Sequence, residues 1–180
     1  MRCTYRYAAT TKEAAQRRRW TFYEAINIDT DQIYPGRYLE LTDPHEVAKH
    51  AMEGIDPGLV KEFQSGDIVI ASTNFGCGSS REHAAVALKA VGIGAILADS
   101  FGRIFYRNAI NLGIPLLVCP HIHELAKKGD MLKIDLSTGQ VTNETTGATA
   151  QAQPLSDYVL KILESGGIKP LIKSQYSDKK

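Results

Sequence analysis

The run from residue 74 to residue 85, Asn-Phe-Gly-Cys-Gly-Ser-Ser-Arg-Glu-His-Ala-Ala, constrains the fold of this chain more than any other segment. An apolar stretch typical of a buried strand, residues 68–71, precedes it, and a helix-forming stretch, residues 82–90, follows it. This order predicts a strand, a glycine-rich loop and a helix. Ser79, Ser80 and Arg81 would then lie at the helix N-terminus, where free backbone N–H groups and the helix dipole favour an anion. The loop therefore predicts a site for a carboxylate or a phosphate.

A second interpretation of the same residues is a capping box. In that motif the Ser79 side chain accepts a hydrogen bond from a backbone amide of the helix, and Glu82 bonds back to the Ser79 amide. A capping box requires neither the cation of Arg81 nor glycines at Gly76 and Gly78. Glycine adopts positive φ and lets the backbone approach a ligand closely. The combination favours the anion site over a cap alone.

Length and composition fit one globular domain. The chain has 180 residues, of which 43% are hydrophobic and 23% are charged. The net charge of +1 argues against nucleic-acid binding, which needs a basic face. No stretch reaches the roughly 18 consecutive apolar residues that indicate a membrane span. We therefore expect neither nucleic acid nor a membrane among the partners.

The cysteines Cys3, Cys77 and Cys119 are far apart in the sequence and form no C-x-x-C pair. We therefore expect no metal site and no iron–sulfur site in this chain. Free thiols are typical of a reducing compartment, which predicts a cytoplasmic location. Cys77 lies within the predicted anion loop, but no base accompanies it locally, so a supporting role is favoured over a nucleophilic one.

The elements predict a single α/β domain with a mixed, largely parallel sheet. Strands and helices alternate between residues 67 and 119, which is typical of parallel strands with helical crossovers. Residues 131–144 have the pattern of an antiparallel hairpin. Asp43 is expected to cap a helix that runs from Pro44 to about residue 52, and a second short helix is expected at residues 56–63.

The two ends of the chain differ from its middle. Residues 1–19 are rich in arginine and contain one acid, Glu13, which is consistent with a disordered basic extension or with a transit peptide. We expect the extension to be disordered, the domain to occupy residues 20–168, and residues 169–180 to form a frayed polar tail.

The loop motif resembles the signature of the aconitase-family swivel domain, and it is most similar to the small subunits of 3-isopropylmalate dehydratases. Residues 29–39, 99–109 and 111–115 agree with the same family in the same order. The resemblance extends from about Trp20 to near Ile168. It implies a three-layer swivelling β/β/α domain.

The resemblance also implies a hydro-lyase reaction, in which water leaves a small hydroxy dicarboxylic acid and returns at the neighbouring carbon. By this resemblance Ser79 is the catalytic base, and Ser80 and Arg81 hold a substrate carboxylate. A [4Fe–4S] cluster is expected on an aconitase-like large subunit, so this chain would bind no cofactor and would be inactive alone. The assembly is expected to be a heterodimer or a heterotetramer, and the isolated chain can self-associate through its uncovered partner surface.

Several residues around the loop are expected to support the site: Asp29, Asp31, Gly76, Cys77, Gly78 and His83. His83 is a tempting acid or base, but a structural role is favoured. Asp29 and Asp31 could bind a divalent cation, although turn formation and orientation of site groups are favoured. Arg103 and Arg107 are interpreted as helix ion pairs or as part of a subunit interface.

Substrate choice is expected to depend on Leu39, Glu40 and Leu41, because the resemblance places the specificity loop there. Glu40 stands where the family often has arginine, so we expect it to need a partner, conceivably Arg37. Leu41 suits an apolar isopropyl group. Ile26 stands where the family often has an acid, for which Glu24 is a possible substitute.

Three functions follow from these observations. The first is isomerisation of 2-isopropylmalate and 3-isopropylmalate in leucine biosynthesis. The second is the same chemistry on another acid, such as homoaconitate or 2,3-dimethylmalate, and Glu40 motivates it. The third is a non-catalytic anion-binding module, which the intact Gly-Ser-Ser-Arg run disfavours.

Overall fold

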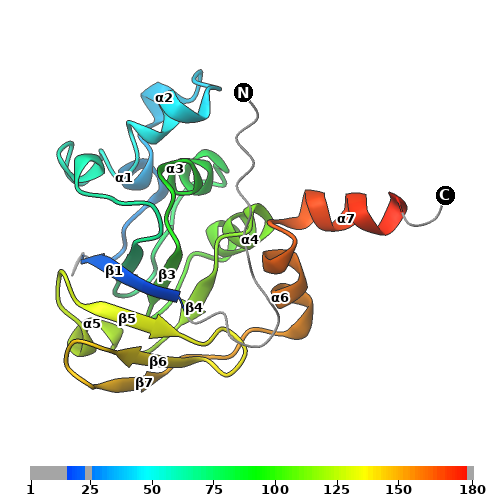
Figure 1. Cartoon of the computed structure of the whole chain (residues 1–180). Coiled ribbons are helices and arrows are strands. Elements are labelled where there is room, and N and C mark those ends of the chain that lie inside the picture. The colour runs from blue at the N-terminus through cyan, green and yellow to red at the C-terminus, as the bar shows by residue number, and fades with distance from the viewer. Residues whose placement is uncertain (1–15, 23–25, 178–180) are drawn as a thin grey trace.

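The computed structural model describes residues 16–22 and 26–177. These residues contain a seven-stranded sheet with the strand order β4-β3-β2-β1-β5-β6-β7 (Figure 1). The strands are β1 Gln16–Phe22, β2 Ile68–Ala71, β3 Ala95–Ala98, β4 Leu116–Val118, β5 Met131–Ile134, β6 Gln140–Asn143 and β7 Thr149–Gln151. The α-helices are α1 Thr30–Ile33, α2 Pro44–Ala48, α3 His83–Val91, α4 Arg103–Leu112, α5 Ile122–Leu125, α6 Asp157–Glu164 and α7 Ile168–Ser177.

One half of the sheet is parallel. Strand β1 pairs with β2, β2 with β3, and β3 with β4, all in parallel register. Every residue of β2 and β3 is buried, as expected for parallel strands that are covered on both faces. The helices α3 and α4 follow β2 and β3 along the chain and contact each other, α4 contacts β4, and α5 contacts both β2 and β3.

The other half is antiparallel. Strand β5 pairs with β1 and β6, and β6 pairs with β7. Burial alternates along β5, where Leu132 and Ile134 are buried and Met131 and Lys133 are exposed. One face of these strands therefore packs on the core and the other meets solvent. The predicted α/β class with a mixed sheet is confirmed. The alternating burial along β5 shows that the antiparallel strands form an outer layer, with solvent on one face.

Strand β1 belongs to both halves. Residues 16–19 pair with β5 in antiparallel register, and residues 20–22 pair with β2 in parallel register. The extension predicted for residues 1–19 is therefore wrong for its last four residues, because backbone pairing with β5 orders them whatever the charge of their side chains. Residues 1–15, Cys3 among them, lie outside the described residues.

Two other predicted segments differ in length. Asp43 caps α2 as expected, accepting hydrogen bonds from the amides of His45 and Glu46 at 2.7 and 3.3 Å, but α2 ends at Ala48. The helix expected at residues 56–63 is a single 3-10 turn at Leu59–Lys61.

The frayed tail expected at residues 169–180 is wrong as far as residue 177. Helix α7, Ile168–Ser177, contacts α4 and α6 and extends away from the sheet (Figure 1). Leu171 is 8% exposed, so an apolar contact on the domain stabilises this helix.

The described part of the chain has no helix that is both long enough and apolar enough to cross a membrane.

Candidate active site

Three loops meet at the carboxyl ends of β1, β2 and β3. Residue 28 accepts a hydrogen bond from the Gly76 amide at 2.7 Å, and Thr30 donates its amide to the Cys77 carbonyl at 2.9 Å. On the other side, the Phe75 amide donates to the Ser100 carbonyl at 3.0 Å and its carbonyl accepts from Gly102 at 2.8 Å. The loop that carries the serines is thus held in the middle of a short continuation of the parallel sheet. In α/β proteins, ligands bind at this edge of the sheet.

Two glycines set the path of the serine loop. Gly76 has φ +75°, and a Cβ built there would lie 2.2 Å from Cγ of Phe105. Gly78 has φ +93° and lies against Thr30 and Asp29. Both positions need a residue without a side chain, the first for space and the second for its backbone conformation. The predicted supporting roles of Gly76 and Gly78 gain a physical basis in these contacts.

The loop leaves Ser79 and Ser80 exposed. The expectation that residues 79–81 begin the helix is wrong, because α3 begins at His83 and Glu82 is its N-cap residue. The capping box is also absent: Glu82 has no side-chain cap bond, and the Ser79 carbonyl instead accepts from Oγ1 of Thr30 at 3.4 Å. Within the described residues the Ser79 and Ser80 hydroxyls have no hydrogen-bond partner, which leaves them available to a ligand.

Arg81 is held by an ion pair with Asp31, and its side chain is 31% exposed. The same Asp31 oxygen accepts from the Gly36 amide at 3.2 Å, and a Cβ on Gly36 would lie 3.2 Å from Nη1 of Arg81. Asp31 therefore orients the arginine. A guanidinium has five N–H donors, so Arg81 keeps donors for a carboxylate.

Asp29 has a different task from Asp31. Its side chain accepts from the Gln32 amide at 2.7 Å, and its own amide donates to Oε1 of Gln32 at 2.9 Å, forming a capping box on α1. The two aspartates thus form a turn and orient a site residue, as favoured above. In the part of the chain that the structure describes, no three His, Cys, Asp or Glu side chains come together as a metal site.

His83 and Cys77 have structural contacts. The ring of His83 stacks on Tyr34, with ring centroids 6.2 Å apart and an interplanar angle of 13°. The thiol of Cys77 lies 3.5 Å from the carbonyl oxygen of Asn27. Both arrangements agree with supporting roles for these residues.

The segment at residues 39–41 follows a 3-10 turn, Gly36–Tyr38. Leu39 and Leu41 are partly buried and pack on the core, whereas Glu40 is exposed. The pairing considered between Arg37 and Glu40 is wrong, because Arg37 pairs with Glu53 at 2.5 Å. Ile26 is 65% exposed, and Glu24 lies outside the described residues.

Sequence reasoning missed Glu53. Besides Arg37, its carboxylate accepts from the Tyr38 hydroxyl at 2.8 Å and contacts Nδ1 of His50 at 2.5 Å. Burial alone would raise the pKa of Glu53, but hydrogen bonds from His50, Tyr38 and Arg37 outweigh it and lower the pKa. Glu53 is sixteen residues from Arg37, and no periodicity of the sequence connects the two positions.

Arg103 and Arg107 are exposed on α4, and neither forms an ion pair with another described residue. The helix ion pairs considered for them are therefore absent there. The alternative, a subunit interface, remains a prediction.

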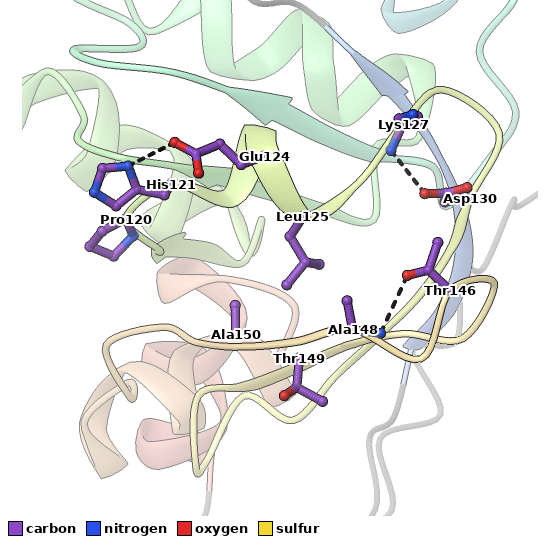
Figure 2. Close-up of a pocket in the computed structure, with 10 residues that line it drawn as sticks. All are labelled: Pro120, His121, Glu124, Leu125, Lys127, Asp130, Thr146, Ala148, Thr149 and Ala150. Atoms are coloured by element: carbon purple, nitrogen blue, oxygen red, sulfur yellow. Dashed lines mark hydrogen bonds and ion pairs between the residues drawn. The ribbon is translucent and has the colours of Figure 1, made fainter.

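An open hollow of about 520 Å³ lies between α5 and the β6–β7 hairpin, and its lining contains none of the predicted site residues (Figure 2). His121 and Glu124 interact at its rim, and Leu125, Ala148 and Ala150 supply apolar surface. Its charged groups are of both signs, so it does not share the anion-binding character of the serine loop.

Comparison with known proteins places this arrangement in a class. Residues 10–120 match the model of the Aconitase C-terminal domain, so an aconitase-type domain is the class to which this fold and this loop correspond.

Within the class of aconitase-type domains, similar proteins of known name identify the family. The chain is 50% identical over 164 residues to the 3-isopropylmalate dehydratase small subunit 1 of Methanopyrus kandleri, covering 91% of this chain and 95% of the relative. It is 47% identical over 159 residues to the isopropylmalate/citramalate isomerase small subunit of Methanocaldococcus jannaschii, covering 88% and 94%. A crystal structure of a 3-isopropylmalate dehydratase from the latter organism superposes with a TM-score of 0.86 at 38% identity, covering 92% of this chain and 97% of that one. The chain belongs to the family of 3-isopropylmalate dehydratase small subunits.

Proposed function

We propose that this chain is the small subunit of a hydro-lyase that interconverts 2-isopropylmalate and 3-isopropylmalate by dehydration and rehydration in leucine biosynthesis. The observation that carries the proposal is the pair of exposed serine hydroxyls beside an arginine oriented by Asp31. This arrangement lies in a chain that aligns with nearly the full length of a relative named for that reaction. A biosynthetic role of this kind fits the cytoplasmic location expected from the cysteines.

Ser79 is the proposed base, which removes the proton next to a substrate carboxylate. A serine hydroxyl is a very weak base in water and works only where its alkoxide is stabilised by nearby donors. The guanidinium of Arg81 lies two residues along the same loop and supplies positive charge. Ser80 and Arg81 are proposed to bind the substrate carboxylate, Arg81 through two parallel charge-assisted bonds.

The partner is proposed to be an aconitase-like large subunit that carries the [4Fe–4S] cluster. Among the described residues, no three His, Cys, Asp or Glu side chains come together, so this part of the chain offers no set of ligands for such a cluster. When bound to the partner, the cluster would act as a Lewis acid on the substrate. The exposed serine loop supports this division, since a site with uncovered hydroxyls needs a second surface to exclude water. A heterodimer or a heterotetramer would both provide that surface.

The identity of the substrate acid is proposed from residues 39–41. Leu39 and Leu41 offer apolar surface beside the turn that contacts Arg81, which suits an isopropyl group. Citramalate is a second candidate, because the Methanocaldococcus jannaschii relative is named for both acids. Homoaconitate and 2,3-dimethylmalate are further candidates, since Glu40 has no ion-pair partner among the described residues.

Anaerobic reconstitution with the large subunit of the same source tests this proposal. Unsaturated-acid formation would be followed in parallel on 3-isopropylmalate, citramalate, homoisocitrate and 2,3-dimethylmalate, with each subunit alone as the control. We expect turnover of 3-isopropylmalate by the pair and none by either subunit. Turnover of only another acid would reject the leucine-pathway assignment, and failure to associate with the large subunit would favour a non-catalytic anion-binding module.

A further inference from the structure

We propose that Glu53 is the positioning residue for the specificity segment at residues 39–41. The inference rests on the proposed function and concerns how this segment is held beside the substrate. The side chain of Glu53 is 15% exposed, and its carboxylate interacts with three side chains from two separate stretches of the chain: Arg37, Tyr38 and His50.

Side-chain contacts hold the entrance to the segment. Tyr38 directly precedes residue 39, and it is fixed at both ends: its hydroxyl donates to Glu53 at 2.8 Å, and its carbonyl accepts from the Tyr34 hydroxyl at 2.9 Å. Its ring stacks on His50 with centroids 3.6 Å apart and planes 14° apart. The guanidinium carbon of Arg37 lies over the same Tyr38 ring, 4.8 Å from its centroid. Glu53 thus joins the side chains of Arg37, Tyr38 and His50 at the entrance.

The segment itself has few directed side-chain contacts. The Glu40 side chain has no hydrogen-bond or ion-pair partner within the described residues, and the side chains of Leu39 and Leu41 make apolar contacts. The amides of Leu39 and Leu41 donate to the carbonyls of Gly36 and Tyr38 at 3.3 and 3.0 Å, so the backbone bonds of the segment lead back to its entrance. Apolar contacts are non-directional. The position of the segment therefore depends on the directed bonds at its entrance, and Glu53 accepts the side-chain bonds of Arg37 and Tyr38 there.

The cluster around Glu53 is connected to the candidate active site. The turn that begins at Gly36 lies against Arg81, 3.2 Å from Nη1 as measured from a built Cβ. On the other side, Glu53 lies between two residues that are docked on α1. The Met52 amide donates to the Ile33 carbonyl at 2.7 Å, and a Cβ on Gly54 would lie 2.5 Å from Cα of Gln32. The two neighbours of Glu53 therefore pack on α1, the helix that carries Asp31, the partner of Arg81.

The backbone at this turn supports the assignment. Met52 has φ +62°, although it is neither glycine nor asparagine, and its side chain is fully buried. A left-handed conformation at such a residue costs about 1 kcal/mol or more and persists only where the surroundings enforce it. Here the conformation directs the next residue, Glu53, toward Arg37 and Tyr38.

The test uses the reconstituted two-subunit enzyme and a Glu53→Gln variant, which keeps the shape and removes the charge. We expect the ratio of kcat/KM for 3-isopropylmalate over citramalate to fall about tenfold, mainly through KM, because a loosened pocket loses discrimination between acids that differ in apolar size. We expect kcat to change less than about threefold, since Ser79 and Arg81 are untouched. Glu46→Gln is the matched control, because Glu46 is an exposed carboxylate on the neighbouring α2 whose ion pair within the described residues is with Lys49.

A second readout is independent of the substrate. Amide hydrogen exchange in residues 39–42 of the full chain should accelerate in Glu53→Gln and stay at the wild-type rate in Glu46→Gln. Tyr38→Phe, which removes one donor and keeps the ring, should shift both readouts in the same direction by a smaller amount. An unchanged ratio or unchanged exchange in a folded Glu53→Gln protein would overturn the proposal. If the wild-type enzyme turns over neither acid, the proposed function fails, and the exchange measurement alone decides the role of Glu53.

Discussion

At the scale of single residues, the serine hydroxyls have no protein partner in the described part of the chain, whereas the arginine beside them has one. A group that binds substrate must be unpaired before the substrate arrives, but a group that orients substrate benefits from being fixed in advance. Ser79 and Ser80 match the first requirement. Arg81, held by Asp31, matches the second.

A Ser79→Ala variant separates catalysis from capping. Because the Ser79 side chain caps nothing in this structure, the free energy of unfolding should change by less than about 0.5 kcal/mol, below the usual loss of a cap. Loss of the proposed base should lower kcat by about 10²–10⁴ with KM nearly unchanged. Chemical denaturation and steady-state kinetics of the reconstituted enzyme measure the two quantities. An active variant with a clear loss of stability would reverse both assignments.

The residues of the loop could be predicted from the sequence because glycines, hydroxyls and a cation are adjacent in it. The contacts between loops could not. Arg81 meets Asp31 across fifty residues, and Glu53 meets Arg37 across sixteen. Such pairs depend on how helices dock, which is set by packing rather than by local spacing. The wrong pairing of Arg37 with Glu40 has this cause, since the nearer acid in the sequence is not the nearer acid in space.

At the scale of elements, the serine loop depends on the contact between its backbone and α4. Phe105, in the first turns of α4, packs edge-on against Phe75 with centroids 5.3 Å apart. Gly76 lies directly against the same ring. The amide of Gly102, just before α4, also donates to the Phe75 carbonyl at 2.8 Å. Side-chain packing and a backbone hydrogen bond therefore both join α4 to the serine loop.

A Gly76→Ala variant tests this contact against a matched glycine. Its Cβ would overlap the Phe105 ring and would also be forced to a positive φ, so we expect a loss of about 2–4 kcal/mol in the free energy of unfolding. Gly147→Ala is the control, because Gly147 has φ +80° with nothing within 4 Å of its Cβ, and should lose only about 1 kcal/mol. Urea denaturation of both variants measures the difference. Equal losses would show that backbone conformation, not contact with Phe105, decides the cost.

Helix boundaries were less predictable than helix positions. The cap at Asp43 follows from residues within one turn of it, and it is confirmed. The end of α2 is decided by docking of the next turn, where the Met52 amide bonds to Ile33. The same holds for α3, whose start is delayed to His83 because Arg81 and Ser79 are bonded to α1 and its neighbours.

At the scale of the whole molecule, buried titratable groups link its stability to pH. Cys119 follows β4 and is fully buried. Burial, with a smaller effect of Asp99, raises the pKa of its thiol to about 11 from an ordinary value of 9.0. Between these values the unfolded chain loses the proton and the folded protein keeps it, so the free energy of unfolding falls as pH rises.

A comparison of the wild-type protein with Cys119→Ala isolates this effect. A shift of two pKa units corresponds to about 2.7 kcal/mol, so the stability difference between the two proteins should shrink by up to roughly that amount between pH 9 and 11. Denaturation in the presence of a reductant at several pH values measures it. The other groups titrate in both proteins and cancel. Parallel stability curves would contradict a buried, protonated thiol.

The alternation of strands and helices was enough to predict the parallel half of the sheet. The place of β1 was not predictable in full, because its first four residues, of sequence Gln-Arg-Arg-Arg, lack the apolar alternation of a strand. They are ordered by backbone pairing with a strand more than a hundred residues later.

That pairing has a consequence for how the chain acquires its structure. Strand β1, the first strand of the described residues, is also the seam between the two halves of the sheet. Its partner β5 is made only after most of the domain has been synthesised. Contacts so distant in sequence are slow to form, because a long loop must close before they contribute. During translation the parallel half can assemble around β2, β3 and β4 while residues 16–19 of β1 remain an unpaired edge. Emergence of the β5–β6 hairpin closes that edge, and β7, α6 and α7 then complete the domain.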